Sequence, residues 1–198
     1  MDALLIVDVQ NDFCPGGALA VTDGDQVVPF INRIRKDYPL VVFTQDWHPR
    51  DHVSFASNHA GKKPYDVIEL HGQPQTLWPD HCVQHSNGAE FHSKLDIRFS
   101  DPVFHKGALR EVDSYSGFLD NDRQHGTGLR EFLQQKGVER LTVVGLATDY
   151  CVKFTVLDAR RFGLQVKVLR QGCRAVNLDP KDEERAYDEM RAAGAEVE

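Results

Sequence analysis

The sequence lacks the features of membrane, secreted and nucleic-acid-binding proteins. No apolar run approaches the roughly 20 residues that cross a bilayer, and the first residues form no basic segment followed by a hydrophobic one and a cleavage site. The 30 acidic residues outnumber the 23 basic ones, which gives a net charge of -7 that no basic stripe offsets. We therefore expect a cytoplasmic protein that binds neither membranes nor nucleic acid.

Cysteine is scarce, and the four cysteines are widely separated along the chain. Without a secretion signal, Cys14, Cys82, Cys151 and Cys173 are expected to be free thiols. No Cys-x-x-Cys pair is present, which argues against a redox role. Repeats, low-complexity tracts and obvious linkers are also missing, so 198 residues with 41% hydrophobic content predict a single domain over residues 1–198.

The chain does contain an alternation of short apolar runs with segments of helical periodicity. The runs, typical of strands buried on both faces of a sheet, are residues 3–9, 40–44, 102–106, 141–145 and 165–169. The predicted helices cover about 27–34, 127–136, 148–162 and 180–193, and residues 195–198 resemble a short last strand. This order predicts an α/β fold with a doubly wound, mostly parallel sheet of about six strands and helices on both faces.

A long irregular segment, at about residues 46–100, interrupts this alternation. It is rich in His, Pro, Asp, Gly and Asn, and only residues 67–70 suggest a strand. Long irregular stretches inside compact domains are usually functional. We expect the metal-binding and substrate-binding loops in this segment.

Three chemically active side chains follow predicted strands. Ligands of an open parallel sheet bind beyond the carboxyl ends of its strands, and Asp8, Lys106 and Cys151 lie at three such ends. Taken singly, each has an ordinary explanation: a turn acid, a solvated strand end and a small core thiol. Their convergence predicts a pocket that combines an acid, an amine and a nucleophile.

The position of Cys151 favours it over the other thiols. Thr148 is a good helix N-cap, and Cys151 follows three residues later, near the positive end of the helix dipole. A nearby Lys106 ammonium would lower the thiol pKa further, so we expect a thiolate near neutral pH. Asp8 could take the thiol proton and deliver it to a departing amine.

A second group of residues suits a divalent metal. Asp46 and His48 form an Asp-x-His pair directly after a strand, and a distant histidine such as His81 can complete the set. Spacing alone does not select that histidine. The other candidates are His52, His59, His71 and His85.

The motifs around these residues resemble those of the nicotinamidases among the isochorismatase-like cysteine hydrolases. The matching segments are residues 6–13 (IVDVQNDF), 46–49 (DWHP), 52–55 (HVSF), 77–82 (LWPDHC), 106–107 (KG), 115–118 (YSGF) and 145–152 (GLATDYCV). The set of Asp8, Lys106 and Cys151 marks the wider superfamily. The Asp-x-His and Trp-Pro-x-His motifs mark the metal-bearing nicotinamidase branch, and the resemblance spans nearly the whole chain.

The resemblance implies a role for each matching residue. Asp8, Lys106 and Cys151 would be the catalytic triad, and the backbone N–H groups of Ala147 and Cys151 the oxyanion hole, with a cis peptide between Leu146 and Ala147. The implied metal ligands are Asp46, His48 and His81, for one divalent ion, zinc ahead of iron or manganese. The implied substrate-pocket aromatic residues are Phe13, Trp78, Tyr115 and Tyr150.

The implied activity is hydrolysis of nicotinamide to nicotinate and ammonia through a Cys151 thioester, in NAD salvage, with pyrazinamide as a further substrate. The partner is then a small molecule, and a homo-oligomer stays open. One alternative is a metal-free amidase for carbamoyl or ureido compounds that keeps the same triad. Another is a non-catalytic module in which the histidines hold structural zinc and Cys151 is inert. Whether His52 assists the metal is left undecided.

Overall fold

The computed structural model describes residues 1–198, and its main feature is a six-stranded sheet. The strands lie in the order β5-β2-β1-β6-β7-β8, and every neighbouring pair is parallel. The strands are β1 (Asp2–Val7), β2 (Leu40–Asp46), β5 (Val103–Lys106), β6 (Arg140–Leu146), β7 (Gln165–Arg174) and β8 (Glu196–Val197). The α-helices are α1 (Val27–Ile34), α2 (Leu129–Gln135), α3 (Lys153–Arg161) and α4 (Asp182–Ala192). No helix is both long and apolar enough to span a membrane.

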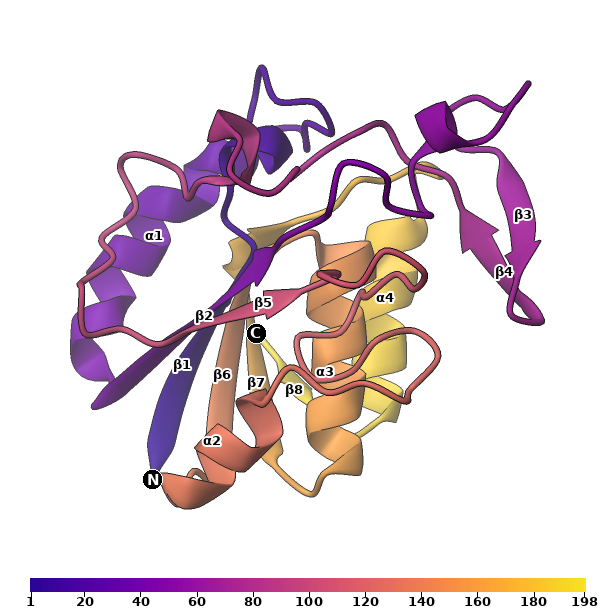
Figure 1. The fold of residues 1–198 in the computed structure, drawn as a ribbon. Coiled ribbons are helices and arrows are strands. Elements are labelled where there is room, and N and C mark those ends of the chain that lie inside the picture. Colours follow the sequence, from indigo (N-terminus) through magenta and orange to yellow (C-terminus); the bar gives the residue numbers. More distant parts are fainter.

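Helices cover both faces of the sheet, because neighbouring residues of each strand point to opposite sides. In β1, Leu4 and Ile6 belong to a hydrophobic core that includes residues of α1. The intervening Leu5 and Val7 belong to a second core, shared with α2, α3 and α4. Figure 1 shows α1 on one side of the sheet and the other three helices on the opposite side. The predicted doubly wound α/β fold is confirmed.

The strand order places the start of a crevice at the end of β1. This strand pairs with β2 on one side and with β6 on the other, so the chain winds outward in both directions from the centre. Such a switch point leaves a crevice at the carboxyl ends of the strands. Asp8 directly follows β1, Lys106 ends β5, and Ala147 directly follows β6.

The segment between β2 and β5 passes over this same edge of the sheet. It contains an antiparallel hairpin, β3 (Val67–Leu70) with β4 (Gln73–Thr76), which projects from the body at the upper right of Figure 1. Isolated bridges join His48 to Val83 and Phe55 to Trp78, which ties the irregular stretch together. The predicted strand at 67–70 is confirmed, whereas its partner β4 was not predicted.

Candidate active site

The three residues predicted at strand ends do meet in one place. The Lys106 ammonium lies 3.3 Å from the Sγ atom of Cys151 and 3.0 Å from Oδ2 of Asp8. It also lies 2.9 Å from Oδ1 of Asp46 and donates to the Ser114 carbonyl oxygen at 3.0 Å. The Lys106 side chain is completely buried. One buried cation therefore contacts the acid, the thiol and a predicted metal ligand.

A hydroxyl group orients the carboxylate of Asp8. Thr44, on β2, donates a hydrogen bond of 2.7 Å to Oδ1 of Asp8. The other oxygen, Oδ2, is buried and has no hydrogen-bond donor of good geometry, although it forms the ion pair with Lys106. Oδ2 is therefore the oxygen available to accept a proton from the thiol of Cys151.

The burial of this cluster raises the pKa of both the acid and the thiol. Burial raises the pKa of Asp8, against the lowering effect of Lys106. Burial likewise raises the pKa of Cys151 well above its ordinary value; Lys106 opposes this shift, and Asp8 and Asp46 add to it. This direction is opposite to the expected thiolate at neutral pH, chiefly because burial disfavours a charged sulfur. As a nucleophile, Cys151 would need a base to take its proton.

The turn that carries Cys151 is wider than a regular α-helical turn. Residues Thr148–Val152 form a π-helical turn, and α3 begins only at Lys153. The backbone N–H groups of Tyr150 and Val152 both donate to the Ala147 carbonyl oxygen at 3.1 Å. The predicted Thr148 side-chain cap is wrong, because its hydroxyl instead lies 3.4 Å from Oε1 of Glu183. The expected cis peptide between Leu146 and Ala147 is present.

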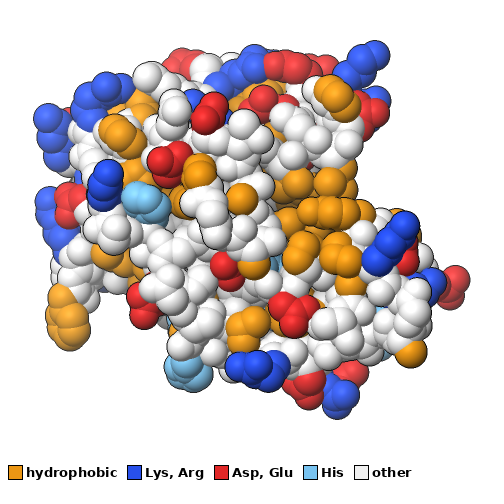
Figure 2. All heavy atoms as spheres, turned by 90° about the horizontal axis from the view of Figure 1, so that it is seen from above, with side chains coloured by type: hydrophobic (Ala, Val, Ile, Leu, Met, Phe, Trp, Pro, Cys, Tyr) orange, Lys and Arg blue, Asp and Glu red, His pale blue; other side chains and the backbone are white.

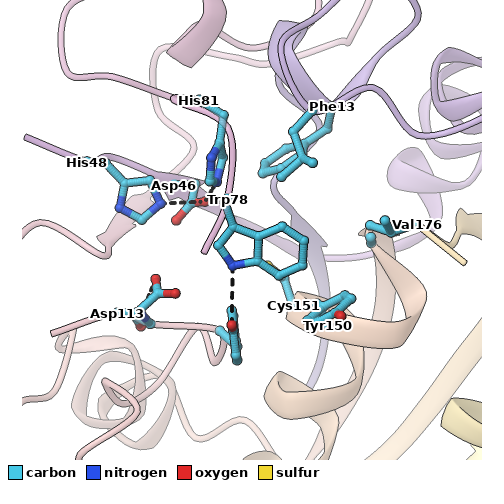
Figure 3. Close-up of a pocket in the computed structure, with 13 residues that line it drawn as sticks. Phe13, Asp46, His48, Trp78, His81, Asp113, Tyr150, Cys151 and Val176 are labelled. Atoms are coloured by element: carbon cyan, nitrogen blue, oxygen red, sulfur yellow. Dashed lines mark hydrogen bonds and ion pairs between the residues drawn. The ribbon is translucent and has the colours of Figure 1, made fainter. Parts of the chain in front are cut away.

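The three predicted metal ligands also converge. The Nε2 atoms of His48 and His81 lie 3.0 Å and 3.4 Å from Oδ2 of Asp46, and all three side chains are buried. Figure 3 shows both rings turned toward this carboxylate. Atoms bound to one ion at about 2.1 Å in tetrahedral geometry are about 3.4 Å apart, which is close to these separations.

The protonation pattern of the two rings fits a metal ion. Nδ1 of His48 faces the Gly107 carbonyl oxygen at 2.9 Å, and Nδ1 of His81 faces the Pro79 carbonyl oxygen at 2.8 Å. A carbonyl oxygen only accepts hydrogen bonds, so each Nδ1 carries the proton. In the neutral rings, both Nε2 lone pairs then point at a carboxylate oxygen. A divalent cation between these three acceptors relieves their repulsion, so the residues fit a metal site.

Glycine is required next to the metal-site histidine. A Cβ atom at Gly107 would lie 2.4 Å from Cε1 of His48, and the glycine φ angle is +62°. A side chain there would displace the ring, and a positive φ is unfavourable for most residues with a Cβ. The Lys106-Gly107 pair of the sequence motif therefore has two purposes: an ammonium for the triad and room for His48.

His52 packs beside His48, one of the predicted metal ligands. Its ring packs against that of His48, with centroids 4.2 Å apart. Its two nitrogens are taken by Oγ of Ser54 at 2.7 Å and the Val112 carbonyl oxygen at 3.1 Å. Burial lowers the pKa of His52 to about 4, so the ring is neutral at pH 7. His48, His52 and Asp113 also form a second buried group whose possible ligand atoms lie within 4.8 Å of one another.

A small pocket lies between the triad and the metal site. Its unfilled space, part of it open to solvent, is about 360 Å³. The residues that line it are Phe13, Leu19, Asp46, His48, Trp78, His81, Asp113, Ser114, Tyr115, Ala147, Tyr150, Cys151 and Val176. All four predicted aromatic residues are among them, and Figure 3 shows Trp78 across the centre with Cys151 behind it. The walls of the pocket are thus formed by aromatic and other apolar side chains. Polar groups lie at its two ends, Cys151 at one and the predicted metal ligands at the other.

Aromatic side chains continue outward from this pocket. Tyr65 and Phe154 are partly exposed, and their rings lie 6.1 Å from Trp78 and 5.3 Å from Tyr115 respectively. Seen from above in Figure 2, hydrophobic side chains gather around a hollow at the right of the view. An uncharged planar ring suits such surroundings better than a charged or extended molecule.

Four residues that line the pocket were not predicted from the sequence. Asp113 and Ser114 directly precede the YSGF motif, and that adjacency was the only available signal. Leu19 and Val176 come from segments far apart in the chain, and no sequence pattern identifies them. Asp149 holds Val176 in place, because its carboxylate accepts hydrogen bonds from the backbone N–H groups of Val176 at 2.9 Å and Asn177 at 2.8 Å.

The loop after Ser114 contains an acid whose ionisation destabilises the fold. Burial raises the pKa of Asp120 to about 6. The folded state therefore holds this proton more tightly than the unfolded chain, and stability is lost as the pH rises from about 4 through 6. We expect Asp120→Asn to be more stable than the wild type by about 1 to 2 kcal/mol at pH 8, less than the full shift because solvent lies close, and by less at pH 5. Urea unfolding at both pH values measures this; an equal difference at each would contradict it.

Comparisons with known proteins agree with this geometry. The chain matches the Isochorismatase domain over residues 2–198. It is 53% identical to a nicotinamidase of Escherichia coli, over 98% of this chain and 92% of that one. The solved structure of an Acinetobacter baumannii nicotinamidase and pyrazinamidase superimposes with a TM-score of 0.96 at 43% identity, covering 99% of this chain and 94% of that one.

A third relative was solved with a metal. The pyrazinamidase of Pyrococcus horikoshii in complex with zinc superimposes with a TM-score of 0.82 at 37% identity, covering 100% of this chain and 98% of that one. The resemblance drawn from the motifs is thereby confirmed over nearly the full length. The chain belongs to the isochorismatase family of hydrolases, among its nicotinamidases and pyrazinamidases.

Proposed function

We propose that this protein hydrolyses nicotinamide to nicotinate and ammonia, accepts pyrazinamide as well, and acts in NAD salvage. The observation that carries the proposal is the contact of one buried ammonium, Lys106, with both the Cys151 thiol and the Asp8 carboxylate, beside a pocket lined by four aromatic residues. The nicotinamidases of E. coli and A. baumannii, similar over nearly the whole chain, support it.

The proposed reaction begins with a proton transfer inside the triad. Oδ2 of Asp8 takes the proton of Cys151, and the sulfur attacks the carboxamide carbon, so that a C–S bond forms and the carbonyl oxygen becomes an oxyanion. Lys106 keeps its charge, because Asp46 and Asp8 raise its pKa although burial alone would lower it. Its ammonium stabilises the thiolate as it forms and the Asp8 anion after the proton has left.

The backbone N–H groups of Ala147 and Cys151 are proposed as the donors to the oxyanion. Both residues line the pocket at the turn that carries the nucleophile. Such donors typically contribute about 3 to 4 kcal/mol each to transition-state stabilisation. Asp8 then gives its proton to the amide nitrogen, the C–N bond breaks, and ammonia leaves a thioester on Cys151. Water gives a proton to Asp8 as it attacks, and Asp8 returns that proton to the sulfur as the C–S bond breaks. The carboxylic acid product loses its proton to ammonia, so that nicotinate, ammonium and the free thiol remain.

Asp46, His48 and His81 are proposed as the ligands of one divalent ion, and zinc is favoured by the zinc complex of the P. horikoshii relative. When bound, the ion would supply a Lewis acid for the ring nitrogen of the substrate. The protein orients the rest of the molecule: Phe13, Trp78, Tyr115 and Tyr150 offer aromatic faces to the ring, while the carboxamide reaches Cys151 at the other end.

An ammonia assay combined with metal analysis tests the proposed function. The purified protein should release ammonia from nicotinamide and pyrazinamide, and release much less from carbamoyl compounds, while carrying about one divalent ion per chain. Removing the ion with a chelator should raise the KM for nicotinamide, and adding zinc should restore it. An active protein without any bound ion that prefers a carbamoyl compound would support the metal-free amidase instead.

Substitution of a ligand gives the matched control for this assay. His81→Ala should lose the ion, because Asp46 and His48 would then be the only two protein ligands of the three that hold it. His125→Ala should keep the ion. The side chain of His125 is 54% exposed and lies outside the pocket. Full metal occupancy in His81→Ala would remove this residue from the ligand set.

Three further expectations from the sequence stay predictions. They are the single domain over residues 1–198, the cytoplasmic location, and the open possibility of a homo-oligomer. We also propose that the protein is not a non-catalytic module with structural zinc. An inert Cys151 thiol would not need the Lys106 ammonium and the Asp8 carboxylate beside it.

A further inference from the structure

The hairpin formed by β3 and β4 has one buried side chain. Between residues 67 and 76, only Gln75 is buried, with 4% of its surface exposed, while its neighbours on the hairpin are exposed or partly exposed. A hairpin with so little apolar burial gains little stability from packing. We therefore look for the structural role of the hairpin in the contacts of Gln75.

The amide of Gln75 holds two side chains of the reaction pocket. Nε2 donates to Oδ2 of Asp113 at 2.8 Å, and to the carbonyl oxygen of Thr76 at 2.7 Å. It also lies 3.4 Å from the hydroxyl oxygen of Tyr115, which accepts a hydrogen bond of 3.3 Å from Nε1 of Trp78. Asp113, Tyr115 and Trp78 all line the pocket, whereas Gln75 itself does not.

A second, larger cavity lies on the other side of these residues. Its unfilled space, part of it open to solvent, is about 1650 Å³. Its lining is mostly polar and includes Gln75, Arg110 and Arg123. Asp113 lines both this cavity and the reaction pocket. The Asp113 side chain is therefore part of the wall between them. The hydrogen bond from Gln75 fixes Oδ2 of Asp113 in this wall, and the backbone N–H of Ser114 donates to Oδ1 at 2.8 Å.

We infer that Gln75 is a positioning residue that sets substrate affinity by holding Asp113 and Tyr115 as the wall of the reaction pocket. The inference rests on the proposed function, since it concerns the binding of nicotinamide and nicotinate. Gln75 acts through its neighbours, and its amide hydrogen-bonds to Asp113, Tyr115 and Thr76 rather than to a member of the triad. Its loss weakens substrate binding and leaves the chemistry of Cys151 in place, which raises KM and leaves kcat nearly unchanged.

Three substitutions separate the hydrogen bond from simple space filling. Gln75→Met keeps most of the volume and loses the donor, Gln75→Ala loses both, and Gln75→Glu keeps the shape but places a carboxylate against Asp113. If the hydrogen bond matters, Met and Ala should raise KM about five- to tenfold, and Glu should raise it most. If Gln75 only filled space, Glu and Met would match the wild type and only Ala would differ.

Binding and a control variant complete the test. In a Cys151→Ala background, calorimetric Kd values for nicotinate should rise in parallel with KM. Gln73→Ala, on the same strand with an exposed side chain, should leave both unchanged. A wild type that hydrolyses nicotinamide, with Gln75→Met and Gln75→Glu unchanged in KM and Kd, would overturn this inference alone. A wild type without nicotinamide hydrolysis would overturn the proposed function and the inference with it.

Discussion

Replacement of Cys151 by alanine is expected to abolish ammonia release from nicotinamide while substrate binding survives. The sulfur is the only nucleophile placed between Asp8 and Lys106, and no other side chain can form the thioester. Removal of a catalytic nucleophile costs on the order of 10⁵-fold or more in kcat. The pocket walls stay in place, because alanine differs from cysteine only by the sulfur atom. Calorimetric titration with nicotinamide measures the binding, and the ammonia assay measures the rate.

A second cysteine provides the control for this substitution. Cys173 on β7 is equally buried but lies outside the pocket, so Cys173→Ala should retain activity within about a factor of three. Ammonia release at near wild-type rate by Cys151→Ala would rule out covalent catalysis. Loss of nicotinamide binding in the same variant would mean that the sulfur also holds the substrate.

Lys106→Met is expected to lose both activity and stability. The ammonium neutralises two buried carboxylates, Asp8 and Asp46, at 3.0 and 2.9 Å. Methionine keeps the volume and removes the charge, so both carboxylates are left without their buried cation. Breaking a buried ion pair in this way costs about 3 to 5 kcal/mol of unfolding free energy. The thiolate also loses its one cationic neighbour, so kcat should fall by at least about 100-fold. Chemical denaturation and the ammonia assay measure the two effects.

A double variant shows whether the unpaired charge is the cause. Asp8→Asn removes one of the carboxylates that Lys106 neutralises, so Asp8→Asn/Lys106→Met should be less destabilised than the sum of the two single variants. Lys63→Met changes the same residue type at an exposed position and should leave stability and rate unchanged. A Lys106→Met protein as stable as the wild type would show that the carboxylates are protonated or otherwise neutralised.

Most of the fold could be predicted because buried parallel strands have a simple sequence pattern. A strand covered on both faces is a continuous apolar run, and β1, β2 and β6 follow runs of this kind. The polar residue that ends such a run then stands out, which is how Asp8 and Lys106 were found. Cys151 was selected for its place at the start of a helix. The reason given for its reactivity, a lowered thiol pKa, is opposite to the direction in the fold, because burial, together with two nearby carboxylates, raises that pKa.

The parts of the site that escaped prediction are held by contacts between distant segments. Gln75 lies in β4, a strand without an apolar pattern, and its partner Asp113 is 38 positions further along the chain. Val176 reaches the pocket only because Asp149 holds its backbone. Periodicity and local motifs do not predict such contacts, because the residues next to each partner in the sequence carry no signal of the distant one.

The sequence by itself indicated which residues are candidates for the chemistry: a strand-end acid and amine, a thiol at a helix start, and an Asp-x-His pair with a later histidine. Only the tertiary structure decided how these groups act on one another. Burial of Asp8, Asp46, Lys106 and Cys151 together sets their charges, and the carbonyl oxygens facing His48 and His81 set which nitrogen is free for an ion. Protonation depends on distance and on access to water, and both are properties of the folded chain.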